Sequence, residues 1–232
     1  MLPDGLHALH LEGGELHRRA TIPSRVVRRI GHRGAKGHAP DNTIESFQKA
    51  LELGCDEVET DVWVLPGGRM VIAHDRPASA SGLLALDDVL DFCRGRMGVN
   101  VELKCEFSET AAYETGSRVG AHLAKRGDPD IYVSSFWWTA LDAVREAAPS
   151  VRRAYLFASS PPLAGLIHES RRTALWALHP NRAFVTERLV RDTHSAGMKV
   201  QAWTVNDPAE ITRFAALGVD GLMSDFPERI PK

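Results

Sequence analysis

The feature that most limits the fold is a regular alternation of short apolar runs with stretches of helical spacing. Apolar runs of strand length occur eight times in the 232 residues, and amphipathic stretches separate them. Strands that alternate with helices pair in parallel, because each helix returns the chain to the same end of the sheet. The sequence therefore predicts an α/β protein with a single closed (β/α)8 TIM barrel rather than an open doubly wound sheet. The expected strands span residues 25–30, 56–64, 98–103, 131–134, 153–157, 174–177, 199–203 and 221–223.

Little of the chain lies outside this alternation. Pro66-Gly67-Gly68 predicts a turn into a short return strand at residues 69–73. Residues 6–20 alternate apolar and polar positions around Gly13-Gly14, which fits either a short N-terminal hairpin or a frayed arm. We therefore expect an arm or hairpin over residues 1–25 and one barrel domain over residues 26–232.

The composition excludes several classes of protein. Lys and Arg number 28 and Asp and Glu 30, a formal charge of -2, so nothing overall favours nucleic acid or an anionic membrane as a partner. The cysteines, Cys55, Cys93 and Cys105, are odd in number and lack C-x-x-C spacing, which argues against a disulfide framework or a zinc site. No apolar run is long enough for a transmembrane segment or a signal peptide. We expect a cytoplasmic protein, whose oligomeric state the sequence leaves open.

The second expected strand carries the two carboxylates of Glu59 and Asp61. Glu59 and Asp61 are two residues apart, and side chains alternate between the faces of a strand, so both point the same way. Such a pair is costly unless one acid takes up a proton or a cation lies between them. Oxygen ligands of this kind suit a hard divalent metal ion, although taken alone the pair also fits two solvated acids.

Further polar side chains follow the neighbouring strands. His32 and Arg33 follow the first strand, His74 follows the return strand, and Glu102 and Lys104 end the third strand. The active site of a TIM barrel lies at the carboxyl ends of its strands, so these side chains should converge with the two carboxylates. Three acids beside two cations fit one divalent metal ion and a phosphate. Two histidines can take a proton from an attacking oxygen and give one to a leaving alkoxide.

These residues lie in motifs that resemble the glycerophosphodiester phosphodiesterase family. The motifs run in order over about residues 28 to 228, and their combination is specific although each is short. They read HRG at 32–34, PDNT at 40–43, ETDV at 59–62, HD at 74–75, ELK at 102–104, SSF at 134–136, WTVN at 203–206 and GVDG at 218–221.

The resemblance implies a phosphoric diester hydrolase that uses one divalent cation, Mg²⁺ or Ca²⁺, to cleave glycerophosphodiesters into glycerol phosphate and an alcohol. Its partner is then a small-molecule phosphodiester. The implied roles are an acid/base pair of His32 and His74, a metal site of Glu59, Asp61 and Glu102, phosphate contacts from Arg33 and Lys104, and a cleft wall that includes Trp203.

One segment departs from the family pattern. A long insertion that forms a cap usually follows the HD motif, whereas here only residues 76–84 precede the next expected helix. The cap is therefore expected to be short or absent, which would leave the cleft open to a bulkier group such as a lysophospholipid.

Two other functions remain open at this stage. One is a lysophospholipase D-like or cyclising phosphodiesterase similar to the sphingomyelinase D enzymes, although those are typically secreted and disulfide-bonded. The other is a catalytically idle barrel that serves as a binding module. The second would be marked by loss of a metal ligand or a histidine, and neither is missing from the motifs.

Overall fold

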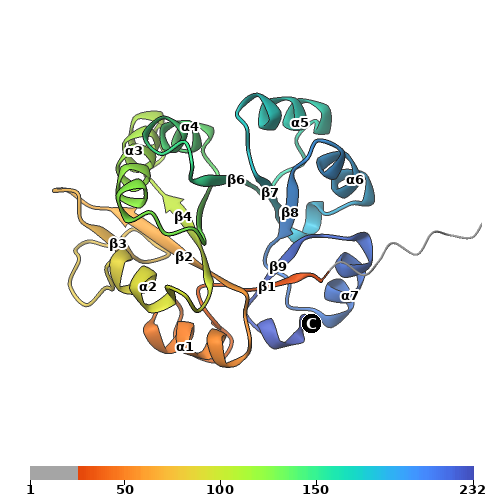
Figure 1. Cartoon of the computed structure of the whole chain (residues 1–232), viewed down its shortest axis with the longest axis horizontal. Helices are drawn as coiled ribbons and strands as arrows, with labels where there is room; N and C mark the ends of the chain where they lie inside the picture. Colours follow the sequence, from red (N-terminus) through yellow and green to blue (C-terminus); the bar gives the residue numbers. More distant parts are fainter. Residues whose placement is uncertain (1–25) are drawn as a thin grey trace, which may run out of the picture.

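The computed structural model describes residues 26–232, so the expected arm or hairpin of residues 1–25 lies outside the described residues. The strands of this part form one sheet that closes on itself, and the helices form a ring around it (Figure 1). The strands are β1 (Arg28–Gly31), β2 (Glu57–Val64), β3 (Met70–Ile72), β4 (Gly98–Lys104), β5 (Ile131–Ser135), β6 (Arg152–Phe157), β7 (Ala177–Pro180), β8 (Lys199–Ala202) and β9 (Gly221–Ser224).

Closure of the barrel follows from the pairing of its first strand. β1 pairs in parallel with β9 on one side and with β2 on the other, while the remaining barrel strands pair with their neighbours in sequence. β3 is the exception, because it folds back antiparallel on β2 after the turn at Gly67 and Gly68. The eight parallel strands confirm the predicted (β/α)8 barrel.

The helices bury their apolar stripes against the outside of the barrel. Phe47 of α1 and Phe214 of α7, for example, are fully buried. α1 begins directly after Thr43, whose hydroxyl accepts a hydrogen bond from the Ser46 backbone N–H at 3.2 Å. The helices are α1 (Ile44–Glu52), α2 (Leu86–Cys93), α3 (Glu109–Arg126), α4 (Trp138–Ala147), α5 (Leu163–Arg172), α6 (Glu187–Ser195) and α7 (Pro208–Leu217), with single 3-10 turns at Arg182–Phe184 and Pro227–Arg229.

One expected strand is displaced. Residues 174–177 read as a strand in the sequence, but β7 begins only at Ala177 and ends at Pro180. The turn that ends α5 continues to residue 175, since the Leu175 backbone N–H donates to the Ser170 carbonyl and Ala174 has a φ of 52°. This left-handed residue ends the helical turn, and the prediction was therefore about three residues too early.

A close contact between α3 and α4 gives a test of the packing. A Cβ placed on Gly116 would lie 2.1 Å from the carbonyl oxygen of Ala140, which is backbone and cannot turn aside. We expect Gly116→Ala to lower the free energy of unfolding by about 1–3 kcal/mol, because overpacking forces the helices apart. Urea unfolding measures this.

The matched control is Gly165→Ala in α5, where a Cβ meets nothing within 4 Å. Alanine favours a helix over glycine, so this change should raise the free energy of unfolding by up to about 1 kcal/mol. An equal loss of the free energy of unfolding in the two variants would show that the contact with Ala140 is not what excludes a side chain at position 116.

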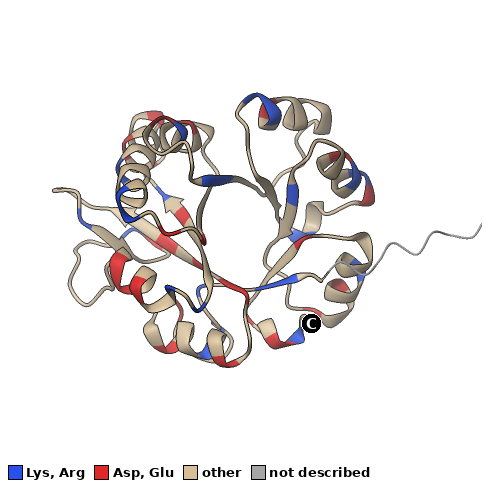
Figure 2. Cartoon of the chain, in the orientation of Figure 1, with Lys and Arg blue, Asp and Glu red and all other residues tan. Residues whose placement is uncertain are grey.

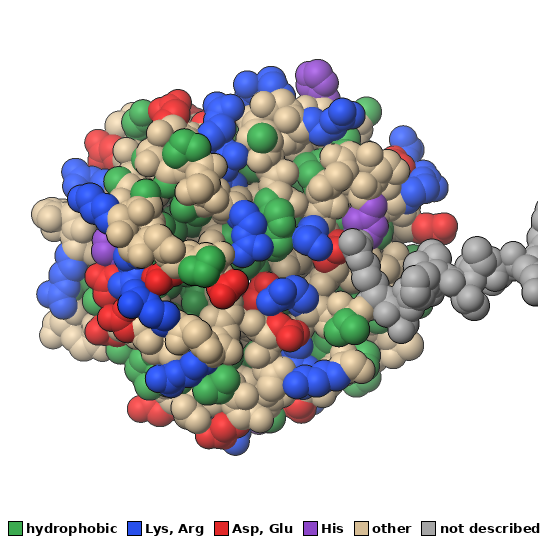
Figure 3. Space-filling model, in the orientation of Figure 1, with side chains coloured by type: hydrophobic (Ala, Val, Ile, Leu, Met, Phe, Trp, Pro, Cys, Tyr) green, Lys and Arg blue, Asp and Glu red, His purple; other side chains and the backbone are tan. Residues whose placement is uncertain are grey.

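Charges of both signs are interspersed over the outer helices and over the face in view, and neither forms a continuous field there (Figures 2 and 3). Recognition of an anion therefore depends on local groups. Within residues 26–232, no helix combines the length and the hydropathy that a membrane crossing requires.

Candidate active site

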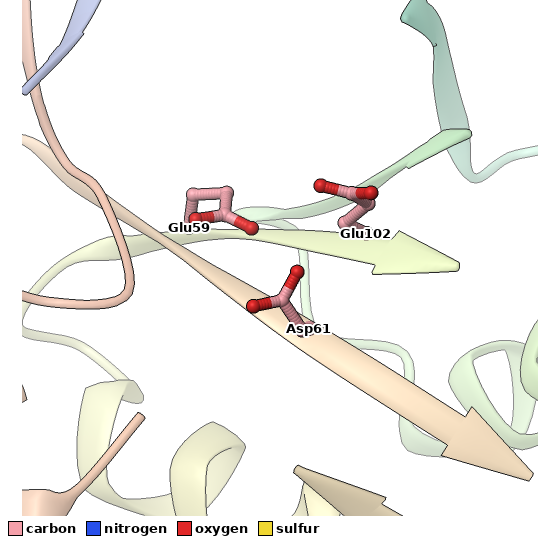
Figure 4. Close-up of side chains that lie close together, drawn as sticks. All are labelled: Glu59, Asp61 and Glu102. Carbon is pink, nitrogen blue, oxygen red and sulfur yellow. The ribbon is translucent and has the colours of Figure 1, made fainter. Parts of the chain in front are cut away.

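Strand register brings three carboxylates together at the carboxyl end of the barrel. Glu59 and Asp61 lie on β2, and Asp61 is directly opposite Glu102 of β4. Their side chains point toward one another in the barrel interior (Figure 4), and one oxygen of each lies within 4.8 Å of the others. The predicted cluster of Glu59, Asp61 and Glu102 is thus a feature of the fold.

The cluster is buried, which changes its protonation. Burial is the largest cause that raises the pKa of Glu59, and the nearby charges of Asp61 and Glu102 raise it further. For Glu102, burial and the charge of Asp61 outweigh the opposing effect of Lys104 and raise the pKa to about 7. Without a cation, part of this cluster therefore holds protons near neutral pH.

Two cationic side chains lie against the same acids. Arg33 Nε is 3.1 Å from Asp61 Oδ2, and Lys104 Nζ is 3.0 Å from Asp61 Oδ1 and also donates to Glu102. Burial alone would lower the pKa of Lys104, but the carboxylates of Glu102 and Asp61 outweigh it and raise the pKa. Three acids beside two cations leave the group one negative charge in excess when all are ionised.

The donor set fits a divalent cation. Every candidate ligand is a carboxylate oxygen, the type that Mg²⁺ and Ca²⁺ prefer. Glu59 Oε1 is buried and makes no hydrogen bond with any of the described residues, so a cation or water would have to satisfy it. This unpaired buried oxygen is more direct support for metal binding than the single excess negative charge of the group.

Two residues with left-handed backbone hold the acids in place. Arg33 has a φ of 51° and its backbone N–H donates to Glu59 Oε2 at 3.0 Å, while Asn42 has a φ of 58°. The Asn42 amide donates to Asp61 Oδ2 at 2.9 Å and accepts from Thr60 Oγ1 at 2.9 Å. Such backbone is costly for side chains other than glycine and is concentrated at functional sites.

His32 lies beside this cluster and is held from the other side. Its Nε2 is 4.0 Å from Glu59 Oε2, and its Nδ1 is 2.6 Å from Asp225 Oδ1 in the loop after β9. Asn206 Nδ2 donates to the second oxygen of Asp225 at 2.7 Å. The structure therefore shows that Asp225 contacts His32 directly and that Asn206 in turn holds Asp225.

His74 lies on the loop after β3 and is more exposed. Its Nδ1 is 2.8 Å from Asp75 Oδ1, and its backbone carbonyl accepts a hydrogen bond from Trp63 Nε1 at 3.3 Å. His74 and Arg33 line the same groove of about 620 Å³, which also borders Asn42. None of the three carboxylates lines this groove, so His74 is related to the cluster only through Arg33 and Asn42, which both contact Asp61.

The segment where the sequence predicts a short or absent cap contains no helix or strand. β3 ends before it at Ile72, and α2 begins after it at Leu86. A segment of this length with Gly82 at a φ of 74° forms a loop and cannot enclose a core of its own.

Trp203 lies at the end of β8, on the rim of the barrel. Its Nε1 donates to the His179 carbonyl at 2.8 Å, and its ring packs edge-on against Phe136 at 5.6 Å between centroids. Phe136 is 40% exposed. The two rings form an apolar part of the rim, but within residues 26–232 the Trp203 indole N–H donates to the His179 carbonyl and not to a carboxylate of the cluster.

The sequence motifs assign no role to three residues of the site. Asn42 and Asn206 belong to the motifs PDNT and WTVN, so the resemblance marked the positions without giving the contacts. Asp225 follows the last strand and lies in no recognised motif. Only the closure of the barrel shows that it reaches His32, which is 193 residues away in the sequence.

The raised pKa of Glu102 predicts how the metal-free protein responds to pH. A carboxyl group with a pKa of about 7 in the fold and an ordinary value of 4.5 binds its proton more tightly when folded. Its stabilising contribution is therefore complete below pH 4.5 and is lost as the pH rises through about 7. In EDTA, the Tm should fall between about pH 5 and about pH 8, and less so for Glu102→Gln.

The measurement is differential scanning calorimetry of both proteins, with and without a divalent cation. A cation should restore Tm at the higher pH because it replaces the lost proton. If the Tm of the two metal-free proteins depended on pH in the same way, burial of the Glu102 carboxyl group could not be the cause of that dependence.

The protein is a (β/α)8 barrel with buried acids, paired cations and histidines at the carboxyl ends of its strands. This arrangement is typical of a hydrolytic enzyme. The model of the glycerophosphoryl diester phosphodiesterase family matches residues 32–81 and 77–229. The chain belongs to this family, and it is a phosphoric diester hydrolase.

Individual relatives agree with this assignment. The glycerophosphodiester phosphodiesterase of Caldanaerobacter subterraneus subsp. tengcongensis is 27% identical over 236 residues, which cover 87% of this chain and 95% of that protein. That of Bacillus altitudinis is 27% identical over 242 residues, covering 88% and 96%. A phosphodiesterase of Oleispira antarctica, solved in complex with the product sn-glycerol-3-phosphate, has a TM-score of 0.78 and is 26% identical, with coverage of 88% and 95%.

Proposed function

We propose that this protein hydrolyses glycerophosphodiesters to glycerol phosphate and an alcohol, with one divalent cation held by Glu59, Asp61 and Glu102. The observation that carries the proposal is the buried carboxylate cluster with two cations against it, at the end of the barrel where such enzymes act. The product complex of the Oleispira relative supports glycerol phosphate as one half of the substrate.

The cation and the two basic side chains divide the work of binding the phosphate. When bound, Mg²⁺ or Ca²⁺ would supply Lewis-acid stabilisation of the charge on the phosphoryl oxygens. Arg33 uses Nε and Nη1 on Asp61 and Asp41, and Lys104 uses part of its ammonium group on Asp61 and Glu102. Guanidinium carries five N–H donors and ammonium three, so both retain donors for phosphate oxygens.

His32 and His74 act in this proposal as the acid/base pair. One accepts the proton of the attacking O–H group, and the other gives a proton to the alkoxide that leaves phosphorus. Neither is a member of the carboxylate cluster, so both remain free for proton transfer. The groove shared by Arg33 and His74 supports a phosphate position between the cluster and His74.

The open loop after β3 leads to a prediction on specificity. Without a cap, few groups contact the alcohol part, so recognition rests on the glycerol phosphate. We expect kcat/KM for choline, ethanolamine and larger alcohols to differ by no more than about tenfold, or about 1.4 kcal/mol. Trp203 and Phe136 would then form one apolar wall of the cleft.

The test is release of the alcohol and of glycerol phosphate from a substrate series in EDTA, Mg²⁺ or Ca²⁺, with lysophosphatidylcholine as a separate arm. Hydrolysis only with a divalent cation supports the proposal, and full activity in EDTA would refute it. A preference of about a thousandfold for one alcohol would show that another rim loop closes the cleft. A preference for lysophosphatidylcholine over every glycerophosphodiester would assign a different substrate class.

A further inference from the structure

The loop after β9 holds His32 through two layers of hydrogen bonds. Asp225 Oδ1 is 2.6 Å from His32 Nδ1, and Asp225 Oδ2 accepts from Asn206 Nδ2 at 2.7 Å. The other end of the Asn206 amide is fixed as well, because its Oδ1 accepts from the backbone N–H of Asp225 at 2.9 Å and from Ser224 Oγ at 3.0 Å. The amide therefore cannot rotate without losing these bonds.

These contacts determine which nitrogen of His32 carries the proton. An ionised carboxylate only accepts hydrogen bonds, so Asp225 requires a proton on His32 Nδ1. Burial tends to raise the pKa of Asp225, but the hydrogen bonds from His32 and Asn206 outweigh it and lower the pKa. In the neutral ring Nε2 is then unprotonated, and this is the nitrogen that faces Glu59, at 4.0 Å from its Oε2.

His74 is held less firmly. Its carboxylate partner is the adjacent residue, Asp75, whose side chain is 96% exposed, whereas that of Asp225 is 20% exposed. No described side chain fixes Asp75 as Asn206 fixes Asp225. The two histidines thus differ in how strongly a carboxylate sets their tautomer.

We propose that Asp225 and Asn206 are positioning residues that hold His32 with its proton on Nδ1 and so make Nε2 the general base. The inference rests on the proposed function and deepens it. Nε2 accepts the proton of the attacking O–H group while the oxygen of that group bonds to phosphorus. The bond from phosphorus to the alcohol oxygen breaks, and that oxygen takes its proton from His74.

Asp225→Asn is the decisive variant, because the structure fixes its orientation. The Asn206 amide donates toward the position of Asp225 Oδ2, so the new carbonyl oxygen should face Asn206 and the new NH₂ should face His32. Nδ1 must then accept, and the proton moves to Nε2. We expect kcat to fall by about a hundredfold to ten-thousandfold, as when the wrong tautomer is imposed on a catalytic histidine, with KM within about threefold.

The matched control is Asp207→Asn, which makes the same change next to Asn206 at the start of α7. Asp207 accepts from the backbone N–H groups of Ala209 and Glu210, and asparagine caps a helix equally well. Its kcat should stay within about threefold of wild type. Binding of Mg²⁺ by calorimetry should be unchanged in both variants, since neither touches the carboxylate cluster.

A double-mutant cycle separates positioning from structural damage. In a His32→Ala background, Asp225→Asn should cause no further loss, because the residue it positions is absent. Nitrogen-15 chemical shifts of the His32 ring should report Nδ1–H in the wild type and Nε2–H in Asp225→Asn. An equal loss in both backgrounds, or an unchanged tautomer, overturns the inference.

The base assignment has its own test with a p-nitrophenyl phosphodiester, whose leaving group needs no proton. Asp225→Asn should remain impaired on this substrate, and recovery of its activity would overturn the assignment. The two proposals fail separately. An active His32→Ala would refute the proposed function, whereas an inactive His32→Ala with an active Asp225→Asn would refute the inference alone.

Discussion

Glu59→Gln is expected to abolish activity by loss of the divalent cation, and Asp61→Asn and Glu102→Gln should do the same. Each amide keeps the shape of the side chain and loses the charge that offsets the cation. Changes to the outer partners of metal ligands already cost about 10–100-fold in affinity, so loss of a ligand should exceed about a hundredfold. Calorimetric titration with Mg²⁺ and Ca²⁺ measures this directly.

The control is Glu52→Gln at the end of α1, an exposed position paired with Lys49 and Gln48. It makes the same chemical change outside the cluster and should leave both metal binding and kcat within about twofold, since exposed pairs contribute little. Saturating metal should partly rescue at least one cluster variant. Wild-type metal affinity in three inactive variants would refute the assignment of the ligands.

His32→Ala and His74→Ala are each expected to lose about two to four decades of kcat, because each removes one proton transfer. The fold should persist, since neither side chain is in the apolar core. Kinetics with a natural glycerophosphodiester and with a p-nitrophenyl phosphodiester separate the two roles. The variant that lacks the general acid should recover on the second substrate.

His38→Ala is the matched control for this pair. His38 lies in the same loop as His32, but its Nε2 is 3.1 Å from Glu228 and its ring packs edge-on against Phe226. Its loss should leave both substrates unaffected within about twofold. If neither His32→Ala nor His74→Ala recovers on the activated substrate, the division into an acid and a base is wrong.

The sequence determined the fold and the composition of the carboxylate cluster because both depend on local periodicity. Alternation of strands with helices implied the parallel barrel, and the two-residue period of β2 placed Glu59 and Asp61 on one face. The same period placed Glu102 beside Lys104 on β4. The missing cap followed from counting residues between His74 and α2.

Local patterns failed where a boundary depended on a turn. The strand β7 begins later than its apolar residues suggested, because Ala174 takes a left-handed conformation and the chain still bonds back to Ser170 at Leu175. Alanine gives no signal for such a turn, unlike glycine. Burial and hydrogen bonding in the folded chain decided the boundary.

Only the tertiary structure decided how the histidines are held. Register between β2 and β4 places Asp61 opposite Glu102, and no sequence period relates two different strands. Closure of the barrel sets β9 beside β1, which brings Asp225 to His32 across 193 positions of sequence. Contacts between distant segments arise from closure of the sheet, so the partner of His32 could not be inferred from the residues around it.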